Sequence, residues 1–207
     1  MPERRFFIQE SLNLDHDEKV EFLNLIEEDC RNVEELYWGC SQVVTDSLQR
    51  NLGIGNKEVF MAATGFAGGV AGNRDVCGAL LGGIMAIGVV YGRSQFETGK
   101  VAHEQPGFLE TRERASKLCD KFKEQFGSMK CADVRQRVGR IPLGDENYLY
   151  TLEGVENHSK CGDVTGITAR LTAEIMLESS EAFPLDIEVR IRDLNRVREL
   201  QKSAKGT

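Results

Sequence analysis

The chain has 207 residues, enough for one sizeable hydrophobic core and at most two small domains. It carries 26 basic and 33 acidic residues, a net charge of −7, which argues against a nucleic-acid-binding surface and indicates an ordinary soluble protein. The N-terminal stretch MPERRFFIQESLNLD lacks the apolar core of a secretory signal, so we expect a cytoplasmic protein. Six cysteines in such a chain indicate metal binding or redox chemistry rather than disulfides.

The N-terminal part of the chain predicts a helix that begins at a capping residue, Asp15 or Asp17, and runs to about Cys30. Val20, Leu23, Ile26 and Cys30 fall near one face of this helix. We therefore interpret Cys30 as a small core residue.

A second helix is predicted from Glu34 to Leu52, because apolar residues recur along it with helical spacing. Cys40 lies on the inward face, next to Gly39. Tyr37 and Trp38 flank the cysteine, where they either shield a buried group from water or belong to the core. Asn56 caps a shorter third helix, from Lys57 to about Thr64.

The glycine-rich segment GFAGGVAGNRD, residues 65–75, precedes the central element of the chain. Glycine-rich turns before helices can hold phosphates, but this one lacks the Gly-Lys-Ser/Thr ending and follows no strand. We interpret it as a hinge, with Asn73 or Asp75 as the cap of the next helix.

Residues Val76 to Tyr91 form an uncharged apolar run, VCGALLGGIMAIGVVY. A membrane span needs about 20 apolar residues, so this shorter run predicts a helix that is buried on every side. Its glycines, at about 1 kcal/mol each relative to alanine, indicate close approach by other backbones. The fold class predicted is all-α, a compact multi-helix bundle around this buried, glycine-rich helix.

The polar stretch SQFETGKVAHEQPG predicts a loop in which His103 is exposed to solvent. Phe108 to Phe126 is then a clear amphipathic helix, and its apolar face carries Cys119, which we interpret as core. Ser128 caps the next helix, with Cys131 in its first turn.

The C-terminal third is less regular. Asn147 to Val155 fits either a short helix or irregular packing, and Ser159 caps a helix with Cys161 in its first turn. Pro184 begins a last helix to about Ser203, and the alternation from Ile187 to Ile191 leaves a short strand as the alternative. As domains we expect an N-terminal helix (1–32), a cysteine-motif helical redox domain (33–178) and a C-terminal helical extension (179–207), which together form one compact unit.

Four cysteines combine an inward-facing helical position with a glycine or a helix start nearby: Cys40, Cys77, Cys131 and Cys161. Helix N-termini favour the thiolate, the form that binds soft metals, and three of these cysteines are so placed. Four thiolates suit an iron–sulfur cluster or a Cys₄ zinc site. Their spacing contains no C-x₂-C pair, so scattered core cysteines remain the alternative.

The sequence around these cysteines resembles the redox-active family named for its C-GCAxxG-C-C signature, which is similar to the cluster-binding part of the split-Soret cytochromes. The matching segments are GCSQVV (39–44), TGFAGGVAGNRDVCGALLGGIMAIG (64–88), FGSMKCADV (126–134) and KCGDV (160–164). The second segment reads Cys-Gly-Ala where the signature has Gly-Cys-Ala. No Cys-x-x-Cys-His occurs, so nothing indicates covalent haem.

The resemblance implies that Cys40, Cys77, Cys131 and Cys161 are the family's four cysteines, and that they ligate an iron–sulfur cluster of the [2Fe–2S] or [4Fe–4S] type. It leaves Cys30 and Cys119 outside the set and implies a homodimer. His158, three residues before Cys161, is either a surface residue or a contributor to the site.

We therefore expect an electron-transfer or redox-sensing protein that serves a partner oxidoreductase. The absence of a second cofactor motif favours an electron carrier or accessory subunit over a self-contained enzyme. The alternatives are thiol–disulfide exchange without metal, which the lack of C-x-x-C weakens, and a Cys₄ zinc interaction module, which a chain of this length does not need for stability.

Overall fold

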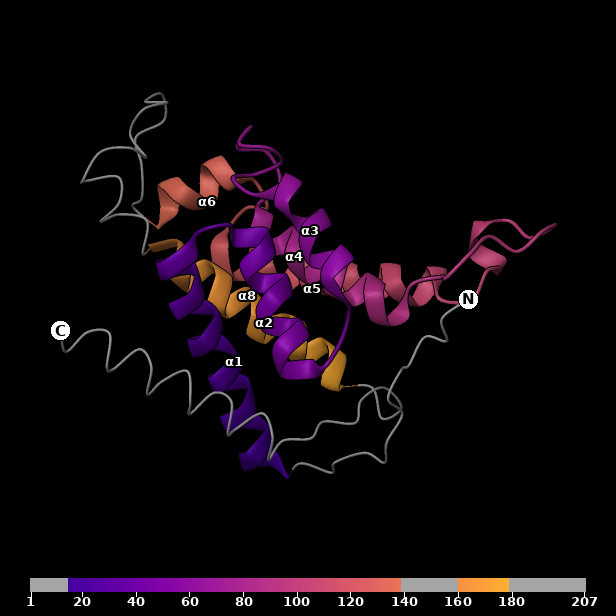
Figure 1. Ribbon diagram of the computed structural model, residues 1–207, viewed down its shortest axis with the longest axis horizontal. Coiled ribbons are helices and arrows are strands. Elements are labelled where there is room, and N and C mark those ends of the chain that lie inside the picture. Colours follow the sequence, from indigo (N-terminus) through magenta and orange to yellow (C-terminus); the bar gives the residue numbers. More distant parts are fainter. Residues whose placement is uncertain (1–14, 139–159, 179–207) are drawn as a thin grey trace.

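The central element of the structure is α4 (Gly78–Tyr91), which packs against α2 (Cys40–Leu52), α5 (Phe108–Phe126) and α8 (Lys160–Leu177). The structure is a computed structural model that describes residues 15–138 and 160–178 (Figure 1). The remaining helices are α1 (His16–Tyr37), α3 (Lys57–Ala63) and α6 (Cys131–Arg137), with short 3₁₀ turns at Thr64–Phe66 and Ala102–Glu104. The described residues contain no β-strand, so the all-α bundle that the sequence predicts is confirmed.

The glycines of α4 permit the close packing expected of them. A Cβ atom on Gly82 would lie 2.5 Å from the carbonyl oxygen of Ser41 on α2, and one on Gly83 would lie 2.5 Å from Oγ1 of Thr172 on α8. The expectation that α4 is buried on every side is wrong for one face. Leu81, Met85 and Val89 are partly exposed and stand outside the packed core, because the described helices around α4 leave this face incompletely covered.

Helix α1 is longer than predicted, because its capping box at Asp15 and Glu18 starts a helix with no break before Tyr37. The predicted boundary between Cys30 and Glu34 is therefore wrong. The chain turns instead at Trp38 (φ 55°) and Gly39 (φ 116°), and α2 begins at Cys40. This later break puts Cys40 at a helix start rather than within a helix.

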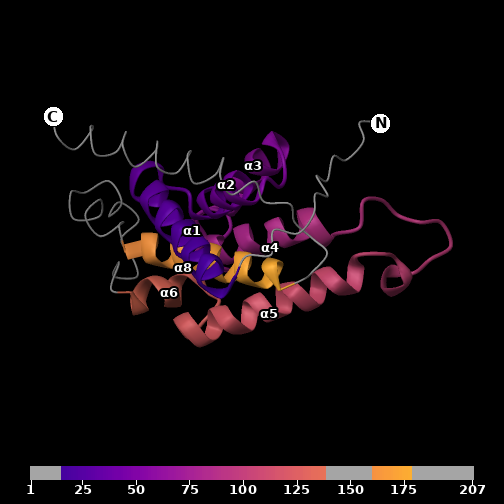
Figure 2. The same cartoon turned by 90° about the horizontal axis from the view of Figure 1, so that it is seen from below.

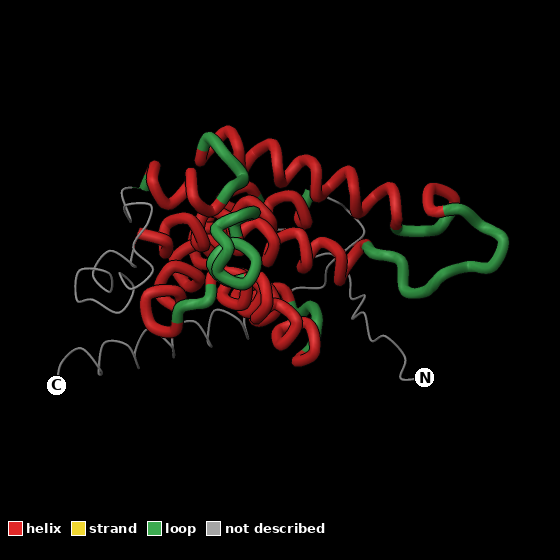
Figure 3. The backbone as a smooth tube through the Cα atoms, turned by 90° about the horizontal axis from the view of Figure 1, so that it is seen from above, coloured by secondary structure: helices red, strands yellow, loops and turns green. Residues whose placement is uncertain are grey.

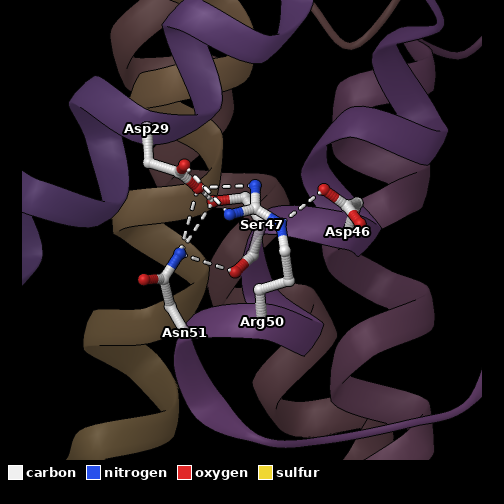
Figure 4. Close-up of polar contacts among 5 residues, drawn as sticks. All are labelled: Asp29, Asp46, Ser47, Arg50 and Asn51. Atoms are coloured by element: carbon white, nitrogen blue, oxygen red, sulfur yellow. Dashed lines mark hydrogen bonds and ion pairs between the residues drawn. The ribbon is translucent and has the colours of Figure 1, made fainter. Parts of the chain in front are cut away.

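A buried carboxylate joins α1 to α2. Asp29, which is 6% exposed, accepts hydrogen bonds from Oγ of Ser47 (2.8 Å), both terminal nitrogens of Arg50 (3.1 and 2.9 Å) and Nδ2 of Asn51 (3.1 Å) (Figure 4). Arg50 also donates through Nε to Asp46, 2.8 Å away. Several donors surround the charge of Asp29, which offsets the cost of removing it from water and fixes α1 against α2.

Two glycines bring α8 close to α1. A Cβ atom on Gly166 would lie 2.6 Å from the carbonyl oxygen of Glu27, and one on Gly162 would lie 3.0 Å from Cγ of Arg31. Any larger residue would push the two helices apart. This contact positions the first turn of α8, which carries Cys161, against the C-terminal half of α1.

Residues 92–107 form an arm that extends beyond the ends of α4 and α5 (Figures 2 and 3). The predicted loop is confirmed here, apart from the 3₁₀ turn at Ala102–Glu104, and His103 is exposed as expected. At the base of the arm Gly107 has φ 80°, and a Cβ atom there would overlap the carbonyl oxygen of Tyr91. Only glycine allows the arm to close at this point.

Three of the predicted features lie outside the described residues: the segment Asn147–Val155, the pair His158 and Ser159, and the helix Pro184–Ser203. Among the helices that are described, none combines the length and the apolar character needed to cross a bilayer.

Candidate redox site

Each of the four cysteines singled out in the sequence lies at the beginning of a helix. Cys40 and Cys131 are the first residues of α2 and α6, Cys77 is the N-cap of α4, and Cys161 is the second residue of α8. Neither Asn73 nor Asp75 caps α4, so that prediction is wrong. Ser128 does not cap α6 either, because the N-cap is Lys130, whose amide donates to the Ser128 hydroxyl.

The four cysteines line one cavity of about 170 Å³. Cys77, Cys131 and Cys161 are buried, and Cys40 is partly exposed. Other lining residues come from α1, α6 and α8 and from the loop before α4: Glu34, Ala67, Gly68, Val134, Arg135, Val164 and Thr165. The structure thus brings together residues that lie as far apart in the sequence as Cys40 and Cys161.

Backbone hydrogen bonds tie the Cys77 segment to the Cys131 segment. The amide of Cys77 donates to the carbonyl oxygen of Met129 (2.8 Å), and the amide of Cys131 donates to the carbonyl oxygen of Asp75 (2.5 Å). Val76 and Lys130 form an antiparallel bridge between them. These contacts fix two of the four sulfur-bearing positions relative to each other by main-chain geometry.

The glycine-rich segment is a strained turn rather than a simple hinge. Residues 68–72 are all left-handed, with φ between 53° and 81°, although positions 70 and 71 are Val and Ala. Left-handed backbone costs a non-glycine residue about 1–2 kcal/mol, and such strain is concentrated at functional sites. The turn carries Gly68 to the cavity wall and presses Gly69 against Cys131, since a Cβ atom on Gly69 would lie 2.6 Å from Cβ of Cys131.

Burial controls the protonation of these thiols. Burial, followed by the charge of Glu34, raises the pKa of Cys40 to about 12, although the amide of Gly68 opposes both by hydrogen bonding to the sulfur. The pKa of Cys77 is raised well above its usual value by burial and by the neighbouring thiols, despite the amide of Ala79. The lowered pKa predicted for Cys77 at its helix start is therefore wrong for the metal-free chain, because desolvation outweighs the helix dipole.

Sequence reasoning missed two charged residues in the cavity wall, Glu34 and Arg135, which are 1% and 9% exposed. A signal for both was present. Glu34 follows the buried Cys30 by four residues on α1, and Arg135 follows Cys131 by four residues on α6, so each shares a helix face with a buried cysteine.

The other cysteines lie outside the cavity wall. Cys30 is fully buried in the core, as predicted, and its thiol hydrogen-bonds the side chain of Thr165, which does line the cavity. Cys119 is half-buried against the core on α5. Tyr37 is neither core nor shield, because 76% of its surface is exposed.

The four cysteine sulfurs line a cavity that is larger than the site of a single metal ion. In residues 15–138 and 160–178, no group of three or more His, Cys, Asp or Glu side chains is arranged to hold one metal ion. The cavity volume of about 170 Å³ compares with roughly 30 Å³ for one water molecule in the liquid. The geometry therefore has room for a group of several atoms.

Comparison with known proteins bears directly on these cysteines. The family model described as "Putative redox-active protein (C_GCAxxG_C_C)" matches residues 38–175. The chain belongs to this family. The match spans α2 to α8 and includes all four cavity cysteines, whereas Cys30 precedes it.

One curated relative and the solved structures complete the comparison. The chain is 26% identical over 117 residues to an "Uncharacterized protein" of Archaeoglobus fulgidus, which covers 56% of this chain and 70% of that protein. No solved structure matches the chain. The family description thus gives redox activity as the class of function.

Proposed function

We propose that the chain is an electron-transfer or redox-sensing protein that holds an iron–sulfur cluster through Cys40, Cys77, Cys131 and Cys161. The observation that carries the proposal is the convergence of these four thiols, each at a helix start, on one cavity. Four thiolates are the usual ligand set of [2Fe–2S] and [4Fe–4S] clusters. When bound, such a cluster takes up and releases single electrons.

The cavity wall fits a cluster in three respects. The thiols are soft donors, as iron–sulfur chemistry requires. The amides of Gly68 and Ala79 hydrogen-bond the sulfurs of Cys40 and Cys77, and such bonds tune cluster potential. The positive ends of the helices favour an anionic occupant, and the wall carries one buried side chain of each sign, Arg135 and Glu34.

Some residues of the cavity wall would bind the cluster, and others would control the access of water and of a partner protein to it. Glycine at position 78 allows the start of α4 to lie close to Cys40, because a Cβ atom there would lie 2.5 Å from the Cys40 sulfur. Buried apolar neighbours such as Val134 and Val164 exclude water. Cys40 is the residue of the four that is partly exposed, so one electron would arrive from a reduced partner protein, and leave to an oxidised one, on its side of the cavity.

Zinc is the weaker candidate for this cavity. A structural Zn²⁺ needs four sulfurs at about 2.3 Å from a single centre. The cavity of about 170 Å³ is larger than one ion requires. Thiol–disulfide exchange remains the metal-free candidate, since the four thiols share one cavity.

The deciding experiment is anaerobic purification followed by iron, acid-labile sulfide and zinc analysis with an absorption spectrum. We expect brown protein that contains iron and sulfide, and we expect Cys77→Ser to lose both. Cys119→Ser is the matched control, since Cys119 lies outside the cavity wall, and it should retain them. Colourless protein with stoichiometric zinc, or metal-free protein with a reversible thiol pair, would assign the site to one of the alternatives.

A further inference from the structure

The carboxylate of Glu34 is enclosed in the cavity wall with the four cysteines. Its residue is 1% exposed and lies in the last turn of α1, where its carbonyl oxygen accepts a hydrogen bond from the amide of Trp38 (3.2 Å). The chain then turns through the left-handed residues Trp38 and Gly39, and α2 begins at Cys40. Glu34 and Cys40 are therefore close in sequence and line the same cavity of about 170 Å³.

The charge of Glu34 acts on the sulfur of Cys40. Burial is the largest cause of the raised pKa of this thiol, and the charge of Glu34 is the next largest cause that raises it. The carboxylate thus opposes a second negative charge at the sulfur. Because Glu34 is buried, water and salt screen its charge only weakly.

The cavity wall also carries a buried cation, the guanidinium of Arg135. This residue is 9% exposed and follows Cys131 by four positions on α6, so the two residues share a helix face. Glu34 and Arg135 therefore bring one charge of each sign to the cavity wall, from two different helices.

The family match separates Glu34 from the other residues of the cavity wall. The match begins at residue 38, so it includes the four cysteines and Arg135 but not Glu34. The family description therefore bears on the thiols and not on this carboxylate.

We propose that Glu34 lowers the reduction potential of the group held in this cavity and that Arg135 raises it. The inference rests on the proposed function, because it takes an iron–sulfur cluster as the occupant. One electron from a reduced partner protein, which is thereby oxidised, would add one negative charge to the cavity. The carboxylate of Glu34 repels that added charge and the guanidinium of Arg135 attracts it, so both act through charge and not as ligands.

The test is a redox titration of the anaerobically purified protein at one fixed pH, followed through the absorption spectrum. Glu34→Gln keeps the size of the side chain and removes its charge. It should favour the reduced state at least about tenfold, a rise in potential of about 59 mV for a one-electron couple. Arg135→Gln should shift the equilibrium at least about tenfold in the opposite direction. A purely structural disturbance has no reason to change sign with the charge that is removed.

Glu35→Gln is the matched control, because Glu35 is the next residue of α1 but is exposed and lies outside the cavity wall. Solvent screens its charge, so the equilibrium should stay within about twofold of the wild type. An unchanged potential in Glu34→Gln, or shifts of the same sign in Glu34→Gln and Arg135→Gln, would overturn the inference. Iron and sulfide in the wild type would then still support the proposed function, whereas a wild type without iron would overturn both.

A second measurement covers a Glu34→Gln variant that fails to assemble the cluster. The neutral reagent iodoacetamide alkylates thiolates, and mass spectrometry gives the rate at Cys40 in the metal-free chain. Glu34→Gln should raise this rate at least about threefold at a fixed pH, because the thiolate is no longer repelled, and Glu35→Gln should not change it. Equal rates in Glu34→Gln and the wild type would show that the charge of Glu34 does not act on the sulfur, and would also overturn the inference.

Discussion

Gly78 and Cys40 are in contact at the start of α4, where a Cβ atom on Gly78 would lie 2.5 Å from the Cys40 sulfur and 2.7 Å from the carbonyl oxygen of Phe66. The sulfur can rotate away, but the Phe66 carbonyl belongs to the backbone and cannot move without shifting the loop before α4. The contact therefore couples the packing of α4 to the position of one proposed ligand.

Gly78→Ala should lower the free energy of unfolding by about 1–3 kcal/mol, because an added methyl group overpacks the site. It should also reduce iron retention after anaerobic purification, since the Cys40 sulfur is displaced. Gly65→Ala is the control, because a Cβ atom at Gly65 meets nothing within 4 Å, and its effect should stay within about 0.5 kcal/mol. Urea unfolding measures the first effect and iron analysis the second. Equal behaviour of the two variants would contradict the predicted contact.

Asp29→Ala should destabilise the chain by about 2–3 kcal/mol, because it leaves the donors of Ser47, Arg50 and Asn51 without their shared acceptor. The estimate lies below that for a fully buried pair, since the Arg50 side chain is 37% exposed. Asp46→Ala removes only the i,i+4 partner of Arg50, and should cost about 0.5 kcal/mol or less. If urea unfolding gave the same loss for both variants, the Asp29 network would contribute no more than a surface ion pair.

The pH dependence of stability in the metal-free chain should report the raised pKa of Cys40. This thiol has a pKa of about 12 in the folded chain, against an ordinary value of 9.0. Below pH 9 the thiol is protonated in both states. Between pH 9 and about 12 only the unfolded chain loses the proton, so stability falls with rising pH by about 1.4 kcal/mol per pH unit.

Urea unfolding at about pH 8 and pH 10.5 measures this effect. The loss of stability between the two conditions should be about 2 kcal/mol smaller in Cys40→Ala than in the wild type. Cys119→Ala replaces a half-buried thiol and should keep most of the wild-type dependence. Identical losses in Cys40→Ala and the wild type would show that Cys40 titrates normally.

Val70→Gly should leave stability unchanged or raise it by up to about 1 kcal/mol. Val70 has φ 60° in the left-handed turn, so glycine removes about 1–2 kcal/mol of strain, which exceeds the entropic cost of glycine of about 0.5–1 kcal/mol. Val59→Gly makes the same change within α3 and should cost about 1 kcal/mol. Thermal unfolding of Val59→Gly should therefore occur at a lower temperature than in the wild type, and that of Val70→Gly at the same or a higher temperature. A clear loss of stability in Val70→Gly would argue against the turn.

The helices were predictable where local signals decide them. Asp15 with Glu18 and Asn56 with Val59 form caps from residues close in sequence, and the amphipathic face of residues 108–126 repeats with helical spacing. The break at Trp38 and Gly39 was missed because apolar spacing continues through it. A left-handed residue at Trp38 contradicts local propensity, and only the surrounding fold can impose it.

The four cysteines that line the cavity were singled out from the sequence, but the raised pKa values of their thiols were not predicted. The glycine context and helix starts pointed to Cys40, Cys77, Cys131 and Cys161, whose separations along the chain give no signal of their own. That they line one cavity depends on helix packing, including the approach of Gly166 to Glu27. The raised pKa of Cys77 depends on burial among other thiols, which the sequence does not contain as a local pattern.

Each cavity cysteine belongs to a different helix, and the last of them, Cys161, lies on the final helix of the described residues. During synthesis the ribosome completes α2, α4 and α6 well before α8 emerges. A nascent chain therefore lacks one wall of the cavity until α8 has docked on α1. Maturation of the site therefore has to follow synthesis of the chain through α8, and a product that ends before α8 cannot carry it.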